Sequence, residues 1–326
     1  MKRTIAWILC LLLAISAVGC AKEEKKQAEK EVVRLGGLTG PTTMGMVKLL
    51  EDNEAGKTEN SYEFTLAGSA DELTPLFIQG ELDIISAPVN LGSILYNRTN
   101  AEVQMLCVNT LGVLYILEKG GNSVQSIEDL KGKTLYATGK GSTPEYTLAY
   151  LLEEKGLKLG EDVQVEWKSE PGEIVSQLAA MDKAICMLPQ PYVTVAMSKA
   201  EGLEMRLDLT EEWDKLGTGT SLITSGVFVR KEFAESHPEA VEKFLAEFES
   251  SVEYVNEHTE EGAALVEKFI QVKTAVAKKA IPYSHMVCIQ GEEMETSTQA
   301  FLTILLGQKP EAVGGALPNW DFYYGN

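Results

Sequence analysis

A run of small and polar residues, Gly139-Lys140-Gly141-Ser142-Thr143, has the composition of a turn that binds an anion. Backbone N–H groups at the start of a helix lack partners within the helix, and glycines let a ligand approach them closely. Three roles fit such a turn: a phosphate loop, a helix cap, or one side of a ligand site. The phosphate loop is excluded, because Lys140 is not followed by Ser or Thr. The other Gly-Lys pair, Gly132-Lys133, has Ile127 where a Walker A motif needs glycine.

A helix must position this turn, and the residues that follow predict one. Thr143 is expected as its N-cap and Pro144 at its first helical position, where the missing N–H costs nothing. Leu148, Leu151 and Leu152 recur at helical spacing and predict a single apolar face. A plain helix cap and one half of a ligand site both stay open for the turn.

The same order of strand, small-residue turn and helix occurs about 100 residues earlier, in EVVRLGGLTGPTTMGMVKLLED (residues 31–52). Two more segments resemble each other, ELTPLFIQGELDIISAPVN (72–90) and EIVSQLAAMDKAICMLPQPY (173–192). Each predicts an amphipathic helix, a tight turn and an apolar strand that ends in proline. These copies predict two α/β lobes of similar topology, and such sheets bind ligands at the carboxyl ends of their strands.

The N-terminus, MKRTIAWILCLLLAISAVGC, has the form of an export signal, with Lys2 and Arg3 before an apolar run too short to span a bilayer. Residues 1–19 are predicted to be the signal peptide. Small residues directly before Cys20 resemble a bacterial lipobox, which predicts an exported protein anchored by lipid on Cys20 to the outer face of the bacterial cell membrane. A plain secretory cleavage is the alternative. Residues 20–31 are highly charged and predict a lipidated N-terminus and flexible tether.

Charge and cysteine content exclude several classes of protein. The formal net charge of −19, without a basic stripe, argues against nucleic-acid binding. Three cysteines lie beyond Cys20, namely Cys107, Cys186 and Cys288. Because their number is odd and they form no CxxC motif, buried free thiols are expected instead of a disulfide framework. His285 and Cys288 alone do not make a zinc site, and the three histidines are scattered. No catalytic triad, metal or cofactor is therefore expected.

Four segments together resemble a known family. They are SIEDLKGKTLYATGKGSTPEYTLAYLLEEKGLKLGEDVQVEW, IQGELDIISAP, LPQPYVTVA and FAESHPEAVEKFLAEF. They look like the solute-binding proteins of ABC importers, specifically the nitrate, sulfonate, taurine and thiamine-precursor (NMT1/THI5-like) group, and the resemblance covers essentially all of residues 32–326. One departure is that Met181 and Ala184 replace the glycine and aspartate of the Gly-x-x-Asp usual in the second lobe.

The resemblance implies an α/β, type II periplasmic-binding-protein fold, in which two lobes are joined by two crossover strands near residues 112–118 and 221–229. Lobe one would comprise residues 32–114 and 222–326, and lobe two residues 115–221. Such a protein is a monomeric, extracytoplasmic solute-binding lipoprotein and not an enzyme. It captures a small polar or anionic molecule and delivers it to an ABC permease of the same membrane. ATP hydrolysis on another subunit leaves it without need of a cofactor.

The implied ligand site lies between the lobes and offers backbone N–H, hydroxyl and amide groups. From lobe one the predicted ligand-binding residues are Thr39, Gly40, Pro41, Thr42, Thr43, Ala87, Pro88, Asn90 and Thr110; from lobe two they are Gly141, Ser142, Thr143, Tyr146, Gln190 and Tyr192. Tyr146, Tyr192 and Trp213 are the candidates for stacking on a flat ligand, with core packing as the alternative. For the hydroxyl groups the alternative is helix capping.

The ligand class stays open between a nitrate- or sulfonate-type anion and a pyrimidine-type heterocycle, because neither turn contains an arginine for a bidentate clamp. Two other functions also stay open. One is a ligand-sensing surface lipoprotein, and the other is an enzyme of cofactor biosynthesis on the same fold.

Overall fold

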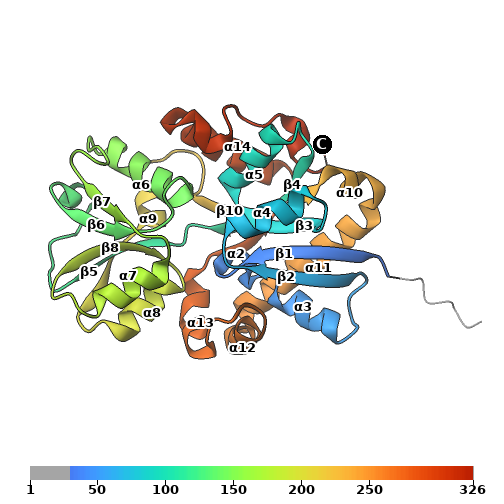
Figure 1. Cartoon of the computed structure of the whole chain (residues 1–326), viewed down its shortest axis with the longest axis horizontal. Coiled ribbons are helices and arrows are strands. Elements are labelled where there is room, and N and C mark those ends of the chain that lie inside the picture. The colour runs from blue at the N-terminus through green and yellow to red at the C-terminus, as the bar shows by residue number, and fades with distance from the viewer. Residues whose placement is uncertain (1–29, 326) are drawn as a thin grey trace, which may run out of the picture. The chain divides into compact units, whose positions relative to one another are not determined.

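Two β-sheets organise the chain (Figure 1). The computed structural model describes residues 30–325. The predicted signal peptide, Cys20 and nearly all of the predicted tether lie outside these residues. The strand order is β11-β4-β10-β3-β1-β2 in the first sheet and β7-β6-β8-β5-β9 in the second.

The first sheet is mixed. Its strands are β1 (Val32–Leu38), β2 (Ser61–Ala67), β3 (Ile84–Pro88), β4 (Val103–Leu111), β10 (Ile223–Arg230) and β11 (Met286–Ile289). β1 pairs in parallel with β2 and β3, whereas β10 lies antiparallel between β3 and β4. The carboxyl ends of β1, β3 and β4 therefore share one edge of the sheet.

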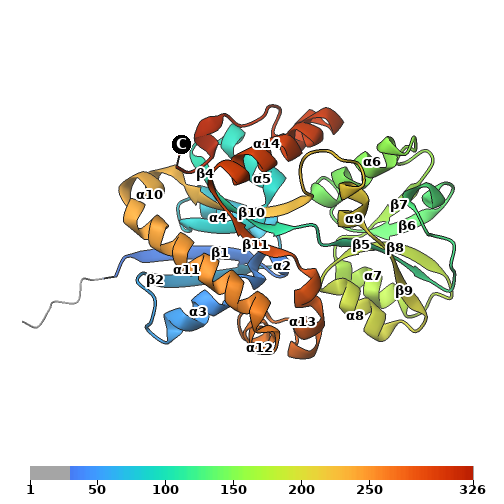
Figure 2. The same ribbon diagram turned by 180° about the vertical axis from the view of Figure 1, so that it is seen from behind.

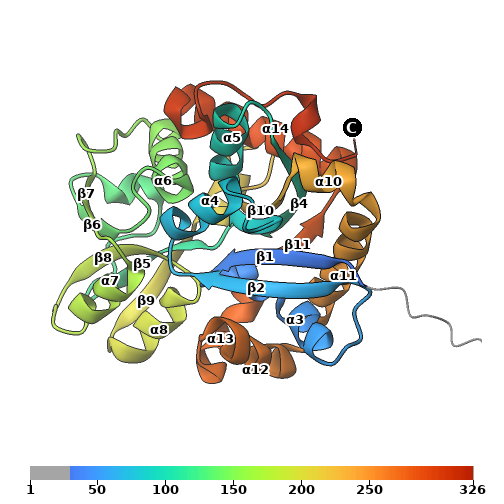
Figure 3. The ribbon, with the colours of Figure 1, turned by 45° about the vertical axis from the view of Figure 1, so that its right-hand side comes forward.

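Helices cover both faces of the first sheet, as its nearly continuous apolar strands require (Figure 3). They are α2 (Pro41–Met44), α3 (Val47–Glu54), α4 (Ala70–Ile78), α5 (Val89–Arg98), α10 (Lys231–Ser236), α11 (Pro238–Glu257), α12 (Thr259–Ile270), α13 (Thr274–Ala280) and α14 (Gly291–Gln308). α3, α11 and α12 bury one apolar face, with Phe244 and Phe248 at its centre, and Figure 2 shows α11 crossing the sheet on this side. α4, α5 and α14 cover the other face through Phe77, Leu95 and Phe301.

The second sheet repeats this plan on a smaller scale. Its strands are β5 (Leu114–Lys119), β6 (Thr134–Ala137), β7 (Gln164–Trp167), β8 (Ala184–Pro189) and β9 (Leu203–Asp208), and its helices are α6 (Thr143–Glu154), α7 (Pro171–Leu178), α8 (Tyr192–Lys199) and α9 (Leu209–Asp214). α7 and α8 pack on one face and α6 and α9 on the other. β6 is parallel to β8, so their carboxyl ends also share an edge. Short 3₁₀ helices are η1 (Ile127–Leu130), η2 (Ile281–Tyr283), η3 (Pro310–Val313) and η4 (Trp320–Phe322).

Two adjacent connections join the two sheets. The first sheet with its helices is called lobe one, and the second sheet with its helices is called lobe two. The chain passes from β4 to β5 through Gly112 and Val113, and it returns from α9 to β10 through Leu222. A Cβ atom placed on Gly112 would lie 2.1 Å from Thr210 Oγ1 and 3.0 Å from Leu222 Cδ2, so the two connections are in close contact. The backbone N–H of Gln190, just after β8, donates to the Val113 carbonyl at 3.0 Å. The carboxyl edge of lobe two therefore lies at the connection that leads out of β4.

Within residues 30–325, no helix is both long enough and apolar enough to cross a lipid bilayer.

Candidate ligand-binding site

A buried polar cluster occupies the carboxyl edge of lobe one. The side-chain nitrogen of Asn109 donates to the Thr42 carbonyl at 2.7 Å and to Ser86 Oγ at 2.6 Å, and Ser225 Oγ donates to Asn109 Oδ1 at 2.6 Å. Ser86 also donates to the Thr42 carbonyl. Because a buried amide has few ways to satisfy all of its groups, this cluster fixes the turn that contains Thr42.

Ser86, Asn109 and Ser225 were not predicted as site residues. The signal that could have found them is a polar residue inside an otherwise apolar strand, as in IISAP, LCVNT and ITSGV. All three are at most 3% exposed, and such residues need partners inside the protein. Their partners come from three different strands, which the local sequence does not reveal.

The predicted turn from Thr39 to Thr43 lies beside this cluster, but its residues from Pro41 onward belong to the short helix α2. The hydroxyl groups of this segment differ in what they bind. Thr43 Oγ1 donates to the Leu38 carbonyl at 2.7 Å, so it closes the turn. Thr110 Oγ1 lies 3.5 Å from the Pro41 carbonyl. Thr42 Oγ1, in contrast, is buried and has no hydrogen-bond partner among the described residues. Thr42 is therefore one residue of this segment whose hydroxyl has no partner within the protein and could bind a ligand.

Backbone geometry explains the glycine of this turn. Gly40 has φ of 137°, a conformation that other residues rarely adopt, and open space surrounds the position of a Cβ atom. Thr39 is exposed and Pro41 half-buried beside it. Ala87 and Pro88 end β3 at the same edge, and Ser225 pairs with both Pro88 and Thr110. The structure thus brings the lobe-one residues predicted from β3 and β4 next to one another.

The lobe-two turn satisfies most of its own N–H groups. The predicted N-cap, Thr143, is wrong by one residue: α6 begins at Thr143, and Ser142 is the N-cap with extended backbone. Ser142 Oγ donates to the Gly139 carbonyl at 2.8 Å instead of capping the helix. The Gly141 N–H donates to a Glu145 carboxylate oxygen at 2.6 Å. Fewer backbone donors are therefore available to a ligand here than the sequence suggested.

Thr143 and Asn90, one from each lobe, form a direct contact. Thr143 Oγ1 donates to Asn90 Oδ1 at 3.1 Å, and Asn90 Nδ2 donates to the Ala312 carbonyl at 3.2 Å. Both side chains are 2% exposed. This hydrogen bond joins two predicted site residues across the lobes, and it fixes the orientation of the Asn90 amide.

The aromatic candidates separate by burial. Trp213 is fully buried, packs against Tyr150 and Phe301, and donates its indole N–H to the Thr220 carbonyl at 2.8 Å, so it is a core residue. Tyr146 is 6% exposed. Tyr192 is half-buried, and burial raises the pKa of its phenol, which keeps the ring neutral. Of these aromatics, Tyr192 has the most surface to offer to a ligand.

A cavity of about 610 Å³ lies beside Gln190, between α8 of lobe two and α13 with η2 of lobe one. Its lining includes Gln190, Thr194, Met197, Met205, Lys279 and Tyr283. Thr194 Oγ1 donates to Gln190 Oε1 at 2.9 Å, which orients that amide. Met197 and Tyr283 are 44% and 50% exposed, unusual for such large apolar side chains. Half of the ten lining residues carry amide, hydroxyl or ammonium groups and the other half are apolar or aromatic, so a cavity of this size suits an organic ligand with a polar end.

Most of this cavity was missed by the sequence prediction, which included only Gln190. The other lining residues come from α8, β9, α13 and η2, far from either predicted turn. The described residues contain no group of three or more His, Cys, Asp or Glu side chains placed to hold a metal ion. Cys107 and Cys186 are buried free thiols, as predicted, and Cys288 is a half-buried one.

Two α/β lobes with adjacent connections and polar groups at their facing carboxyl edges define the two-lobed fold of periplasmic binding proteins. A model described as NMT1/THI5 like matches residues 102–262. This match spans just under half of the chain and agrees with the family resemblance seen in the sequence. The two-lobed α/β fold predicted from the sequence is confirmed by the two sheets and their helices.

Curated relatives match part of the chain. Proteins of Brucella abortus and Brucella suis, named as binding proteins, are 25% identical over 183 residues, which is 56% of this chain and 54% of theirs. The chain thus spans about half the length of the curated relatives that it matches.

Three solved structures illustrate the likeness. An ABC transporter protein from Parabacteroides distasonis has a TM-score of 0.75 at 21% identity, over 90% of this chain and 99% of that one. The aliphatic sulphonate binding protein SsuA of Escherichia coli has a TM-score of 0.69 at 19% identity, over 87% of this chain and 90% of that one. The nitrate-binding protein NrtA of Synechocystis PCC 6803 has a TM-score of 0.61 at 13% identity, over 87% of this chain and 84% of that one. At these identities the likeness concerns the fold.

Proposed function

We propose that this protein is an extracytoplasmic solute-binding protein that captures a small organic molecule between its two lobes and delivers it to an ABC permease. The observation that carries the proposal is the position of the 610 Å³ cavity, which lies between the lobes beside Gln190, with walls from α8 and β9 of lobe two and from α13 and η2 of lobe one. Binding between hinged lobes couples capture to closure, and closure is the signal that a permease can recognise. This role needs no catalytic group.

The cavity narrows the two ligand classes that the sequence left open. Nitrate is far smaller than the cavity and would leave its apolar walls without contacts. A sulfonate with an organic group, or a pyrimidine-type heterocycle, would cover Met197 and Met205 with apolar atoms. Lys279 and Gln190 would then offer a charge and an amide to its polar end. Thr42 Oγ1, buried without a partner, is not among the residues that line this cavity, and it remains a separate candidate taken from the sequence.

The finer parts of the proposal concern the membrane. We propose that Cys20 carries the lipid anchor and that residues 20–31 tether the body, which acts as a monomer, to the outer face of the bacterial cell membrane. We also propose the lobe boundaries at residues 114/115 and 221/222. The solved structures of sulphonate- and nitrate-binding proteins support an exported carrier of small molecules through their shared fold.

Isothermal titration calorimetry and thermal unfolding of the body from Ala21 test this function. The panel is nitrate, taurine, longer alkanesulfonates, pyrimidines and thiamine. A ligand at one hundred times its dissociation constant adds about 2.7 kcal/mol to stability. We expect one organic class to raise the melting temperature and nitrate to have no effect. Failure of every class to bind, or binding that survives both Met197→Ala and Gln190→Ala unchanged, would overturn the proposed site.

A further inference from the structure

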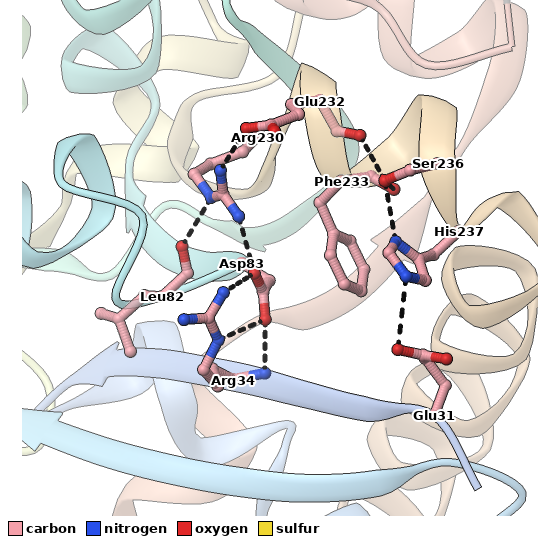
Figure 4. Close-up of polar contacts among 9 residues, drawn as sticks. All are labelled: Glu31, Arg34, Leu82, Asp83, Arg230, Glu232, Phe233, Ser236 and His237. Carbon is pink, nitrogen blue, oxygen red and sulfur yellow. Dashed lines mark hydrogen bonds and ion pairs between the residues drawn. The ribbon is translucent and has the colours of Figure 1, made fainter. Parts of the chain in front are cut away.

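The two lobes carry different residues at one equivalent position. This position lies where β3 and β8 begin, at the edge of each sheet opposite the carboxyl ends of these strands. In lobe one, Asp83 directly precedes β3 and is 1% exposed. Arg34 of β1 donates to its carboxylate from the backbone N–H and from Nε, both at 2.9 Å, and from Nη2 at 2.5 Å. Arg230 of β10 donates from Nη2 at 2.9 Å (Figure 4). One carboxylate thus binds three strands together.

Strand pairing identifies the same place in lobe two. β8 corresponds to β3, since each lies between a parallel strand, β6 or β1, and an antiparallel one, β5 or β10. Asp83 lies five residues before Pro88, and Ala184 lies five residues before Pro189. Ala184 therefore stands where lobe one has its buried carboxylate. Its partner on β5 is Lys119, in the place of Arg230.

Lobe two has a cavity of about 450 Å³ at this place, and three lysines line it: Lys119, Lys133 and Lys183. Lys119 Nζ donates to the Leu178 carbonyl at 2.8 Å, and Lys133 Nζ to Ser123 Oγ at 3.1 Å. Within the described part of the chain, none of the three forms an ion pair with a carboxylate. Lobe two has thus kept a basic side chain, Lys119, at the position of Arg230, and a methyl group replaces the carboxylate. The β6 residue opposite Ala184, at the position of Arg34, is Thr134, and the other two lysines of the cavity, Lys133 and Lys183, directly precede Thr134 and Ala184.

One carboxylate does line the cavity, but it is engaged elsewhere. Glu118 accepts hydrogen bonds from the Ser123 N–H at 2.8 Å, from Ser123 Oγ at 2.6 Å and from the Val124 N–H at 3.1 Å. Arg206 Nε lies 3.5 Å from the same group. Burial opposes its ionisation, but these donors outweigh burial and lower the pKa of Glu118. Its charge is therefore satisfied by Arg206 and the loop that it anchors.

We propose that this lobe-two cavity binds a small tetrahedral oxyanion, phosphate or sulfate, between the ammonium groups of Lys119, Lys133 and Lys183. The oxyanion takes the role that the Asp83 carboxylate has in lobe one and ties the ends of β5, β6 and β8 together. Three like charges around one cavity repel one another, and an anion converts that repulsion into charge-assisted hydrogen bonds. The site is separate from the proposed ligand site, and it does not depend on transport.

Thermal unfolding and calorimetry with inorganic phosphate and sulfate, against chloride at equal ionic strength, test the proposal. We expect both oxyanions to raise the melting temperature above the chloride value. Lys133→Gln and Lys183→Gln should each weaken phosphate binding about tenfold. Lys131→Gln is the matched control: it removes the same charge two residues from Lys133, at a side chain that pairs with Asp162 outside the cavity. It should leave phosphate binding unchanged.

Ala184→Asp gives the sharpest test, because it restores the carboxylate that lobe one has. The variant should unfold at a higher temperature than the parent protein in chloride, and it should lose the response to phosphate. If this variant does not fold, the two lysine variants still test the proposal.

The proposal is overturned if phosphate still raises the melting temperature of Ala184→Asp and of both lysine variants, or if phosphate has no effect on the parent protein. Binding only to phosphatidylglycerol vesicles overturns it as well, since a lipid headgroup would then be the partner. Thr42→Val should keep the phosphate response, which separates this site from the proposed ligand site.

Discussion

Thr143 of lobe two donates its hydroxyl hydrogen to Asn90 Oδ1 of lobe one, 3.1 Å away, where both side chains are almost completely buried. Asn90 is held in turn by the Ala312 carbonyl. The first turn of α6 therefore meets the first turn of α5 through side chains, not through the backbone groups that the sequence suggested. Any ligand that closes the lobes must act together with this hydrogen bond.

Replacing Thr143 by valine should weaken both stability and ligand binding. The change keeps the side-chain volume but leaves Asn90 Oδ1 buried without its donor, which costs about 1–3 kcal/mol. We expect the dissociation constant for the ligand found in the panel to rise about tenfold, since each 1.4 kcal/mol is a factor of ten. Urea unfolding and calorimetry measure the two effects. Thr147→Val is the control on the same helix, because Thr147 Oγ1 is buried without a partner. Equal effects of the two variants would refute this account.

Thr42→Val separates binding from stability. Thr42 Oγ1 is buried and unpartnered, so its removal should leave the free energy of unfolding unchanged or slightly higher. If the hydroxyl contacts the ligand, affinity should still fall about tenfold. Calorimetric titration of the variant with the ligand decides this. Unchanged affinity would assign the turn from Thr39 to Thr43 a structural role alone.

The sequence predicted the elements that position the site better than the contacts within it. Local spacing was enough to place Ser142 directly before a helix, and repeated strand patterns predicted two lobes. Thr42 was predicted in a turn, but it lies in the one-turn helix α2 (Pro41–Met44). It could not place Ser225 beside Asn109, because β10 joins the sheet from a segment more than 100 residues away. The N-cap was misassigned because Ser142 and Thr143 are both suitable caps, and the choice depends on which one keeps extended backbone.

Long-range packing also explains why the cavity was missed. Lys279 lies in α13 and Tyr283 in η2 directly after it, in a segment where the sequence predicted no site residue. They face Met197 and Gln190 only because α13 packs against α8 across the lobes. Apolar residues at helical spacing predict a buried face, and they do not show which element will cover it.

Gly112→Ala should destabilise the connection between the lobes. The new methyl group would lie 2.1 Å from Thr210 Oγ1 and 3.0 Å from Leu222 Cδ2, so the two connections must move apart. Overpacking of this kind costs about 1–3 kcal/mol. Adding Thr210→Ala should recover part of the loss, because it removes the nearest atom. Gly172→Ala in α7, where nothing lies within 4 Å of the new atom, is the control and should be neutral. A double variant no more stable than Gly112→Ala would contradict the proposed clash.

Asp83 should make the stability of lobe one depend on pH. Burial opposes the charged form of its carboxylate, but hydrogen bonds from Arg34 and Arg230 outweigh burial and lower its pKa. The native state therefore holds this proton less tightly than the unfolded chain, whose aspartate pKa is about 3.9. The resulting stabilisation is fully present above that value, and it is lost as pH falls through the lower native pKa.

Asp83→Asn measures this contribution. At pH 7 the change leaves two arginines without their carboxylate, and we expect a loss of about 3 kcal/mol. This is the lower end of the range for a broken buried pair, because the Arg34 side chain is 37% exposed and solvent screens it. Urea unfolding at several pH values should show the gap between the two proteins closing below about pH 4. Glu63→Gln, an exposed carboxylate on β2, is the control and should show no comparable loss at pH 7. A gap that stays constant from pH 7 to pH 3 would mean that Asp83 stabilises the three strands through its shape and not through its charge.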